Sequence, residues 1–326
     1  MRTFFKLLAV ALVAIAGWAA WTLFVPLSPG GQKFVLLRPG YSSRKIASEL
    51  RSAGVIRSEN AFLLWHYWHH KGRLKAGEYM FDKPANETAV HQRLVHGDVY
   101  VHTVVIPEGY TLFDIANVIE EAGLGSRQEF LTTVRSQAAL INDLDPTARS
   151  LEGYLFPNTY QFTRTQSMQD MVAIMVKEFR QVAQQIGLNS DVHRIVTMAS
   201  IIEKETAVPE ERPIVASVYY NRLDKRIALD ADPSVIYAKL IDGSYQGTLH
   251  HTDMQIESPY NTYRHAGLPP GPIANPGRSS LEAAMHPATT DYYYFVSNGN
   301  GHHRFASSLE EHNRNVAAYR KAVRGQ

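Results

Sequence analysis

The stretch "DVHRIVTMASIIEKET", Asp191 to Thr206, predicts an amphipathic helix that packs into a folded core. Its apolar residues recur at helical spacing, and two acids, Glu203 and Glu205, stand close to its end. At about 100° per residue these acids lie about 160° apart around the helix, so an intact helix cannot direct both at one site. Both acids border the apolar face, and the helical pattern therefore does not choose between them.

A carboxyl group on such a face has two possible roles. Burial raises the pKa of a carboxyl and keeps it protonated near neutral pH, which is what a general acid requires. Alternatively, both acids form ordinary, partly exposed ion pairs near the end of the helix. The spacing alone favours the ion pairs, so the choice depends on the rest of the sequence.

The composition is that of an ordinary globular protein with about two domains. Of 326 residues, 45% are hydrophobic and 20% are charged. The formal net charge of +2 lacks the concentrated basic field of a nucleic-acid-binding protein, so no nucleic-acid partner is expected. The chain has no cysteine, which excludes disulfides, zinc–thiolate sites, cysteine nucleophiles and a lipid-modified N-terminal cysteine.

An uncharged apolar stretch at residues 7–25 follows the basic residues Arg2 and Lys6. It is long enough to cross a hydrocarbon core of about 30 Å at about 1.5 Å per residue. A cleaved signal peptide is the alternative, but the apolar core of such peptides has only roughly 7–15 residues. Because basic residues precede the stretch, we expect residues 1–6 in the cytoplasm, a single transmembrane helix at 7–25, and the remainder outside.

The segment after this stretch contains an internal repeat. "RPGYSSRKIASELRSAGVI" (38–56) aligns with "PEGYTLFDIANVIEEAGL" (107–124) at a constant offset. Each copy predicts a strand, a glycine turn and an amphipathic helix that ends at a glycine. We interpret residues 32–145 as small related α+β modules, which resemble the LysM-like modules that bind the glycan chains of peptidoglycan. The alternative is a spacer that holds the next domain away from the membrane.

Residues 150–326 predict a mainly helical domain with a short sheet. Asp232 stands before a proline in this region, and the turn-rich segment at 258–277 carries Asn261 and Tyr263. Ordered loops with amide and phenol groups are typical of carbohydrate sites, where they bind hydroxyl groups and pack against sugar rings. Such loops are more often plain connectors, so this pattern alone does not establish a site.

The blocks of this region, taken together, resemble the YceG-like family of endolytic murein transglycosylases, also called MltG. The resemblance covers nearly everything after the apolar stretch. Where the family usually has "FPDTY", this chain has Asn158, which puts in doubt only a role for that acid. The resemblance implies an α+β fold with an N-terminal transmembrane helix, LysM-like α+β modules and a mainly helical catalytic domain with a small sheet. The blocks are "LEGYLFPNTY", "ASIIEKET", "VASVYYNRL", "DADPSVIYA", "SPYNTY", "GLPPGPIANPG", "AAMHPA" and "YYYFVSNGNGHHRF".

The resemblance also implies a reaction, the cleavage of the β-1,4 bond between N-acetylmuramic acid and N-acetylglucosamine. The catalytic glutamate of the family falls on Glu205, and Glu203 then supports the fold or a neighbouring loop. Glu205 would protonate the leaving oxygen and then accept the proton of the muramyl 6-hydroxyl as a 1,6-anhydro ring closes. Because the sugar supplies its own nucleophile, neither a cofactor nor a second carboxylate at the usual distance of about 5–9.5 Å is required.

Motif position adds predicted substrate-binding residues and family context adds predicted partners. The substrate-binding candidates are Glu152, Asp232, Asn261 and Tyr263. The family context implies an inner-membrane protein with its catalytic domain in the periplasm. It also implies peptidoglycan glycan strands as substrate, peptidoglycan synthases as partners, and a role in terminating the elongation of nascent strands.

Three alternatives to this reading come from other classes. Asp232 could serve as the partner acid of a muramidase-type hydrolase, and the domain could instead be a non-catalytic peptidoglycan-binding scaffold. The 14 histidines raise the third, a metal hydrolase. No H-E-x-x-H or comparable spacing is present, so we predict no metal site.

Overall fold

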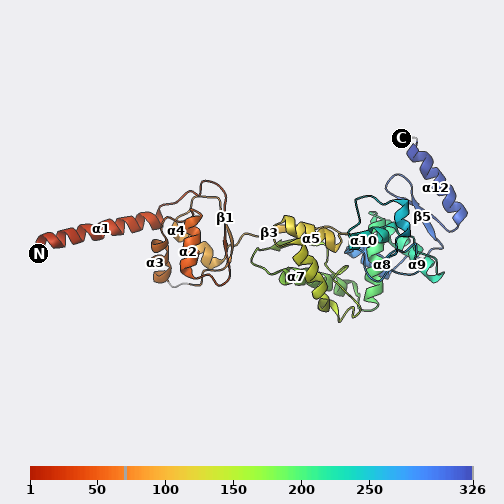
Figure 1. The fold of residues 1–326 in the computed structure, drawn as a ribbon, viewed down its shortest axis with the longest axis horizontal. Coiled ribbons are helices and arrows are strands. Elements are labelled where there is room, and N and C mark those ends of the chain that lie inside the picture. Colours follow the sequence, from red (N-terminus) through yellow and green to blue (C-terminus); the bar gives the residue numbers. More distant parts are fainter. Residues whose placement is uncertain (70–71, 325–326) are drawn as a thin grey trace. The chain divides into compact units, whose positions relative to one another are not determined.

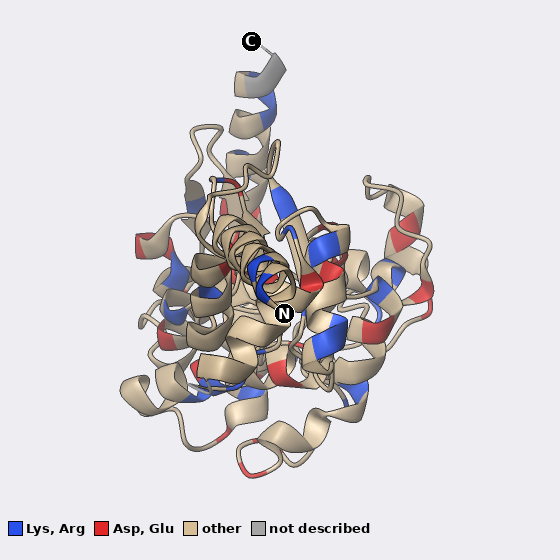
Figure 2. Cartoon of the chain, turned by 90° about the vertical axis from the view of Figure 1, so that its left-hand side faces the viewer, with Lys and Arg blue, Asp and Glu red and all other residues tan. Residues whose placement is uncertain are grey.

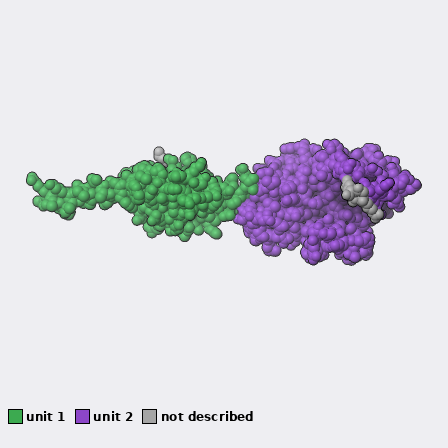
Figure 3. Space-filling model, turned by 90° about the horizontal axis from the view of Figure 1, so that it is seen from above, with its two compact units in different colours: residues 1–103, 161–167 green, residues 104–160, 168–326 purple. Residues whose placement is uncertain are grey.

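The chain folds as two compact units (Figure 3). The structure, a computed structural model, describes residues 1–69 and 72–324. Its architecture combines helices with small two-stranded sheets, as the predicted α+β class requires, and it begins with one apolar helix. The LysM-like character of the repeat stays a prediction. Unit 1 comprises Met1–Thr103 and Gln161–Ser167, and unit 2 comprises Val104–Tyr160 and Met168–Gln326.

Unit 1 begins with the long apolar helix α1 (Arg2–Phe24). It has 23 residues, and an 18-residue window within it has a mean hydropathy of 2.2, so by length and composition it is able to cross a membrane. Figure 2 shows basic residues near its N-terminus and a ribbon without charged residues beyond them. A signal sequence has the same features, so the helix by itself is only a weak indication of a membrane anchor.

The body of unit 1 is a two-stranded antiparallel sheet with three helices (Figure 1). Strand β1 (Lys33–Leu37) pairs antiparallel with β2 (Gly77–Phe81), and helix α2 (Ser43–Ser52) packs on β1. Helices α3 (Glu59–His69) and α4 (Glu87–His96) complete the layer. The buried side chains of both strands and of the helices form a small core, whose fully buried large side chains are Leu37, Leu50, Ile56, Phe62, Tyr79, Phe81 and Leu94.

Unit 2 is mainly helical and holds the sheet in which β5 (Tyr294–Ser297) pairs antiparallel with β6 (His303–Ala306). Strand β3 (His102–Ile106) pairs with β4 (Asn158–Phe162), and each of these two strands has residues in both units. Short 3₁₀ turns of unit 2 lie at Ala138–Ile141, Pro209–Glu211 and His251–Gln255. Its helices are α5 (Leu112–Glu121), α6 (Arg127–Ser136), α7 (Met168–Ile186), α8 (Val192–Glu205), α9 (Arg212–Asp224), α10 (Asp232–Asp242), α11 (Arg278–Met285) and α12 (Leu309–Arg324).

Helix α8 lies at the centre of unit 2 and confirms the helix predicted from "DVHRIVTMASIIEKET". It packs against α9, α10 and α11, and most of the apolar side chains on its predicted face are fully buried, whereas Ile195 is partly exposed. Burial on several sides explains the width of the apolar arc, because a helix covered by one neighbour needs a narrower stripe. The fully buried side chains are Val196, Met198, Ala199, Ile201 and Ile202.

Both copies of the repeat form the predicted strand, glycine turn and helix. Gly40 and Gly109 have positive φ angles of 88° and 76°, a region that favours glycine. Each helix starts at a hydroxyl cap, because Ser42 and Thr111 accept hydrogen bonds from the backbone N–H three residues on. The two copies belong to different units. The domain boundaries at residues 145 and 150 stay a prediction.

The turn of the second copy is held by other parts of unit 2. Gly109 donates its N–H to the carbonyl of Asn275 at 2.9 Å, and Lys204 Nζ donates to the carbonyl of Gly109 at 3.2 Å. In the first copy, no atom of the described residues lies within 4 Å of the place where a Cβ on Gly40 would stand. The same local sequence pattern therefore forms a docked turn in one copy and an open turn in the other.

A buried carboxylate, Glu152, joins three separate segments of unit 2. It accepts hydrogen bonds from Leu112 N–H at the start of α5 (3.1 Å), from the Tyr237 hydroxyl on α10 (2.8 Å) and from Asn275 Nδ2 (3.0 Å). Its side chain is only 2% exposed, and burial raises its pKa to about 8 despite these three donors. Satisfying this group requires all three segments to be in place.

We expect Glu152→Ala to lower the free energy of unfolding by about 3 kcal/mol, because it leaves three buried donors without an acceptor. Urea unfolding followed by circular dichroism measures this change. Glu282→Ala, which removes an exposed carboxylate from an i,i+4 pair with Arg278, is the matched control. That control should change stability by less than about 0.5 kcal/mol. Equal effects of the two substitutions would contradict a structural role for Glu152.

Candidate active site

Glu205, the last residue of α8, faces a cavity of about 410 Å³. The helix ends here because Thr206 adopts an extended conformation, so Glu205 projects from the C-terminal end of a rigid element. The cavity wall combines aromatic rings with acidic and basic groups, a combination suited to a polar ligand with ring faces. Its lining residues are Glu205, Tyr219, Arg222, Leu229, Asp230, Asp232, Tyr263, Tyr294, Phe295, Leu309 and His312.

The surroundings of Glu205 raise its pKa to about 7. Burial is the main cause, and the negative charge of Asp232 acts in the same direction. The Tyr219 hydroxyl opposes the shift by donating a hydrogen bond to Oε1 at 2.7 Å, and the charge of Arg222 opposes it as well. A large fraction of Glu205 is therefore protonated near neutral pH, the state in which a carboxyl group donates a proton.

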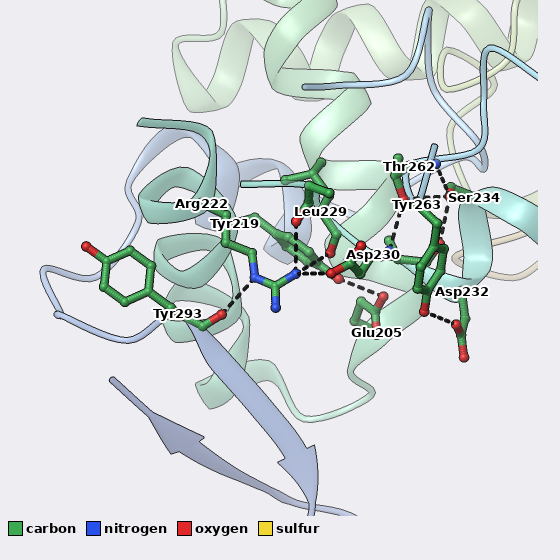
Figure 4. A network of polar contacts seen from close by, with 12 residues as sticks. Glu205, Tyr219, Arg222, Leu229, Asp230, Asp232, Ser234, Thr262, Tyr263 and Tyr293 are labelled. Carbon is green, nitrogen blue, oxygen red and sulfur yellow. Dashed lines mark hydrogen bonds and ion pairs between the residues drawn. The ribbon is translucent and has the colours of Figure 1, made fainter. Parts of the chain in front are cut away.

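One wall of the cavity is organised by α9 (Figure 4). Tyr219 and Arg222 stand three residues apart on this helix and therefore share a face. Arg222 donates to the carbonyls of Tyr293 (2.7 Å) and Leu229 (2.9 Å), and it pairs with the Asp230 carboxylate at 3.2 Å. Asp230 has a φ of 50°, a conformation that non-glycine residues rarely adopt. The guanidinium group thus holds an unusual backbone segment beside Glu205.

The opposite wall carries two of the predicted substrate-binding residues, Asp232 and Tyr263. Asp232 begins α10, and the Tyr263 hydroxyl donates to its Oδ1 at 2.5 Å. Beneath them the Ser234 and Thr262 hydroxyls bond to each other at 2.8 Å, and Thr262 Oγ1 accepts from the N–H of Ala231 at 3.0 Å. These buried bonds fix the start of α10 to the loop that presents Tyr263.

Glu203 points away from the cavity into an ion pair. Its Oε1 lies 3.0 Å from Arg212 Nη2, and its Oε2 accepts the N–H of Gly277 at 2.9 Å. Both partners belong to the supporting structure of unit 2, and Gly277 precedes α11. Glu203 therefore supports the neighbouring loop, as expected, and the two acids of α8 have different environments because they leave the helix in different directions.

The other two predicted substrate-binding residues, Glu152 and Asn261, do not line this cavity. Asn261 is fully buried, donates to the carbonyls of Met254 (3.0 Å) and Ile256 (2.9 Å), and accepts the N–H of Tyr263 at 3.0 Å. It braces the turn that presents Tyr263. Substrate contacts at Glu152 and Asn261 stay a prediction that this geometry does not favour.

Several cavity residues were missed by the sequence reasoning. The i,i+3 spacing of Tyr219 and Arg222 in "VYYNRL" is a usable signal, because it places a phenol and a cation on one helical face. Phe295 on β5 gave no such signal, since its place depends on the β5–β6 pair. That pair is held by Glu211, whose carboxylate contacts His303 Nδ1 at 2.7 Å, and no local pattern connects residues so far apart in the sequence.

Comparison with known proteins places this arrangement in a family. The profile of the YceG-like family matches residues 35–318. The chain belongs to the YceG-like family. This confirms the resemblance carried by the sequence blocks, among them the "EKET" block that contains Glu205.

Relatives in the YceG-like family extend the comparison. A protein of Bacillus subtilis (strain 168) named endolytic murein transglycosylase is 36% identical over 301 residues, covering 86% of this chain and 82% of that protein. A protein of the same name from Streptococcus pneumoniae serotype 2 is 30% identical and covers 96% of this chain, which spans 64% of the streptococcal protein. The crystal structure of a YceG-like protein from Listeria monocytogenes aligns with a TM-score of 0.57 at 34% identity, covering 87% of this chain and 99% of that one.

The raised pKa of Glu205 predicts a pH-dependent difference between the wild type and Glu205→Gln. Between the ordinary pKa of a glutamate and about 7, Glu205 carries a proton in the folded state but not in the unfolded state. The stability that this proton gives is fully present below the ordinary pKa and is lost as pH rises through about 7. The Glu205→Gln variant has no titrating group at this position, so its stability does not change with pH for this reason. Between pH 4 and pH 8 we expect the variant to gain about 3 kcal/mol in free energy of unfolding relative to the wild type.

Urea unfolding of both proteins at several pH values measures this difference. Subtracting the stability of the variant from that of the wild type at each pH cancels the other titrating groups to first order. A stability difference that stays constant from pH 4 to pH 8 would contradict the raised pKa of Glu205.

Proposed function

We propose that the protein is an endolytic murein transglycosylase that cleaves the β-1,4 bond between N-acetylmuramic acid and N-acetylglucosamine. The observation that carries this proposal is Glu205, a carboxyl with a pKa raised to about 7 that faces an open cavity lined with aromatic and acidic side chains. The printed names of family relatives at 30–36% identity support the same activity. Glu205 also occupies the position of the catalytic glutamate in the family block.

The proposed reaction uses Glu205 first as an acid and then as a base. Tyr219 engages Oε1 of the carboxyl, so we assign the transferable proton to Oε2. Glu205 gives this proton to the glycosidic oxygen as the bond from that oxygen to C1 of the muramyl residue breaks. The resulting carboxylate accepts the proton of the muramyl 6-hydroxyl as that oxygen bonds to C1. The product is a 1,6-anhydromuramyl end, water is not consumed, and Glu205 is again protonated.

The other cavity residues have proposed roles in binding. Tyr263 offers its ring to a sugar ring, and Asp232 offers a carboxylate to sugar hydroxyls. Asp232 also helps Glu205 to keep its proton, because its negative charge raises the pKa of that group. Arg222 holds the backbone around Asp230 and so keeps the cavity wall in place for the substrate.

A muramidase-type hydrolase is the second candidate, because Asp232 lines the same cavity as Glu205. In that scheme Asp232 would act as the second carboxylate, and water would supply the oxygen at C1. The two candidates differ in their products, since hydrolysis leaves reducing ends and transglycosylation leaves anhydro ends.

The location of the enzyme follows from the same proposal. We propose that α1 anchors the chain in the cytoplasmic membrane with residues 1–6 inside, because Arg2 and Lys6 precede the apolar stretch. The catalytic domain would then face the periplasm, where LysM-like modules bind glycan and synthases are neighbouring partners. Cleavage beside a growing strand would terminate its elongation.

We expect uncrosslinked glycan strands to give products with anhydromuramyl ends, detected by mass spectrometry. Glu205→Gln should reduce cleavage at least about 100-fold, because it removes the only proposed acid and base. Glu203→Gln, which changes the neighbouring acid that lies off the cavity, is the matched control and should retain cleavage. Hydrated reducing ends would favour the hydrolase, and bound but uncleaved strands would favour a binding scaffold.

The activity should also depend on pH through Glu205. Because the protonated carboxyl starts the reaction, kcat/KM should fall as pH rises through about 7. Asp232→Asn removes a charge that raises the pKa of Glu205, so the falling limb of the profile should move to lower pH. Rates that increase above pH 7, or a limb that Asp232→Asn leaves in place, would argue against Glu205 as the initial acid.

A further inference from the structure

Helix α3 of unit 1 has an exposed apolar face. Ala61 and Phe62 are buried in the core of the unit, whereas Leu64, Tyr67 and Trp68 point outward and are 61%, 54% and 79% exposed. Their spacing of three and four residues puts them on one side of the helix. Large apolar side chains gathered on one exposed face mark an interaction site.

The end of α1 is fixed to the body of unit 1. Arg57 donates to the carbonyls of Val25 (2.5 Å) and Pro26 (2.8 Å), and Asn86 Nδ2 donates to the carbonyl of Phe24 at 3.3 Å. These bonds occupy carbonyls at the end of the helix, which would otherwise need water. The body of unit 1 therefore starts directly where α1 ends, without a flexible spacer.

Helix α3 lies beside this fixed end. The Phe24 ring meets the Trp65 ring edge-on at 5.6 Å between centroids, and Trp65 stacks on His69 at 3.6 Å. Figure 1 shows α3 at the end of unit 1 from which α1 projects, while β1 lies at the other end. If α1 crosses a bilayer, α3 is at the level where the helix leaves it.

We propose that the face formed by Leu64, Tyr67 and Trp68 on α3 rests in the headgroup region of the membrane. This inference relies on the proposed anchoring by α1. Tyrosine and tryptophan prefer the membrane–water interface, where one part of the ring system is apolar and the other is hydrated. A helix with such a face binds in the plane of the interface. Phe24 at the end of α1 is half exposed and contacts Trp65 of α3, so the apolar surface of the proposed anchor ends beside this helix and argues for lipid as the occupant.

The absence of cysteine in the sequence permits a direct test in the full chain. Leu64→Cys is labelled with a polarity-sensitive fluorophore and the protein is reconstituted into phosphatidylcholine–phosphatidylglycerol vesicles. Nitroxide-labelled phosphatidylcholine then serves as the quencher. Val13→Cys in α1 reports on the anchor, and Phe34→Cys on β1 is the matched control, an exposed apolar residue of the same unit.

We expect a blue-shifted emission at position 64 and lipid quenching several-fold stronger than at position 34. Adding Trp68→Ser to the labelled Leu64→Cys protein should weaken that quenching. Quenching at position 13 without quenching at position 64 would overturn the inference and leave the anchor intact. A blue shift at position 64 without lipid quenching would mean that protein, such as a second copy of the chain, covers the face instead. Lack of quenching at position 13 would refute the anchor and, with it, the inference.

Discussion

The arrangement of unit 2 depends on the hydrogen bonds made to one buried carboxyl group, that of Glu152. Glu152 is enclosed by donors from the start of α5, from α10 and from the loop that contains Asn275. A group of this kind destabilises the fold if its partners are missing and stabilises it when they are all present. The second copy of the repeat is thereby tied to α10, the helix whose first residue, Asp232, stands in the cavity.

Two glutamates with raised pKa values occupy this unit, and their surroundings assign them different roles. Glu152 does not line the cavity of Glu205 and receives three hydrogen bonds from different segments, so its side chain is committed to the fold. Glu205 receives a hydrogen bond from Tyr219 and faces open space, so its proton is accessible to a ligand. Burial raises both pKa values, but only access to the cavity makes the shift useful for proton transfer.

The sequence predicted the elements well and the directions of side chains poorly. Helix α8 and the repeated strand, turn and helix were predicted from the local spacing of apolar residues and glycines. This spacing is a property of each segment by itself. Helical periodicity could not separate Glu203 from Glu205. The difference comes from Arg212 and Gly277, which bind Glu203 and lie outside α8. Asn261 and Tyr263 are two residues apart, yet only the phenol reaches the cavity, since the amide satisfies backbone carbonyls beneath it.

The docked turn of the second repeat copy has a consequence for sequence drift. Lys204, which holds the carbonyl of Gly109, immediately precedes Glu205 in the chain. Changes in this turn are therefore transmitted to the backbone beside the proposed acid, whereas changes at the open turn around Gly40 meet no such neighbour among the described residues. The turn with Gly109 should therefore accept fewer substitutions than the turn with Gly40.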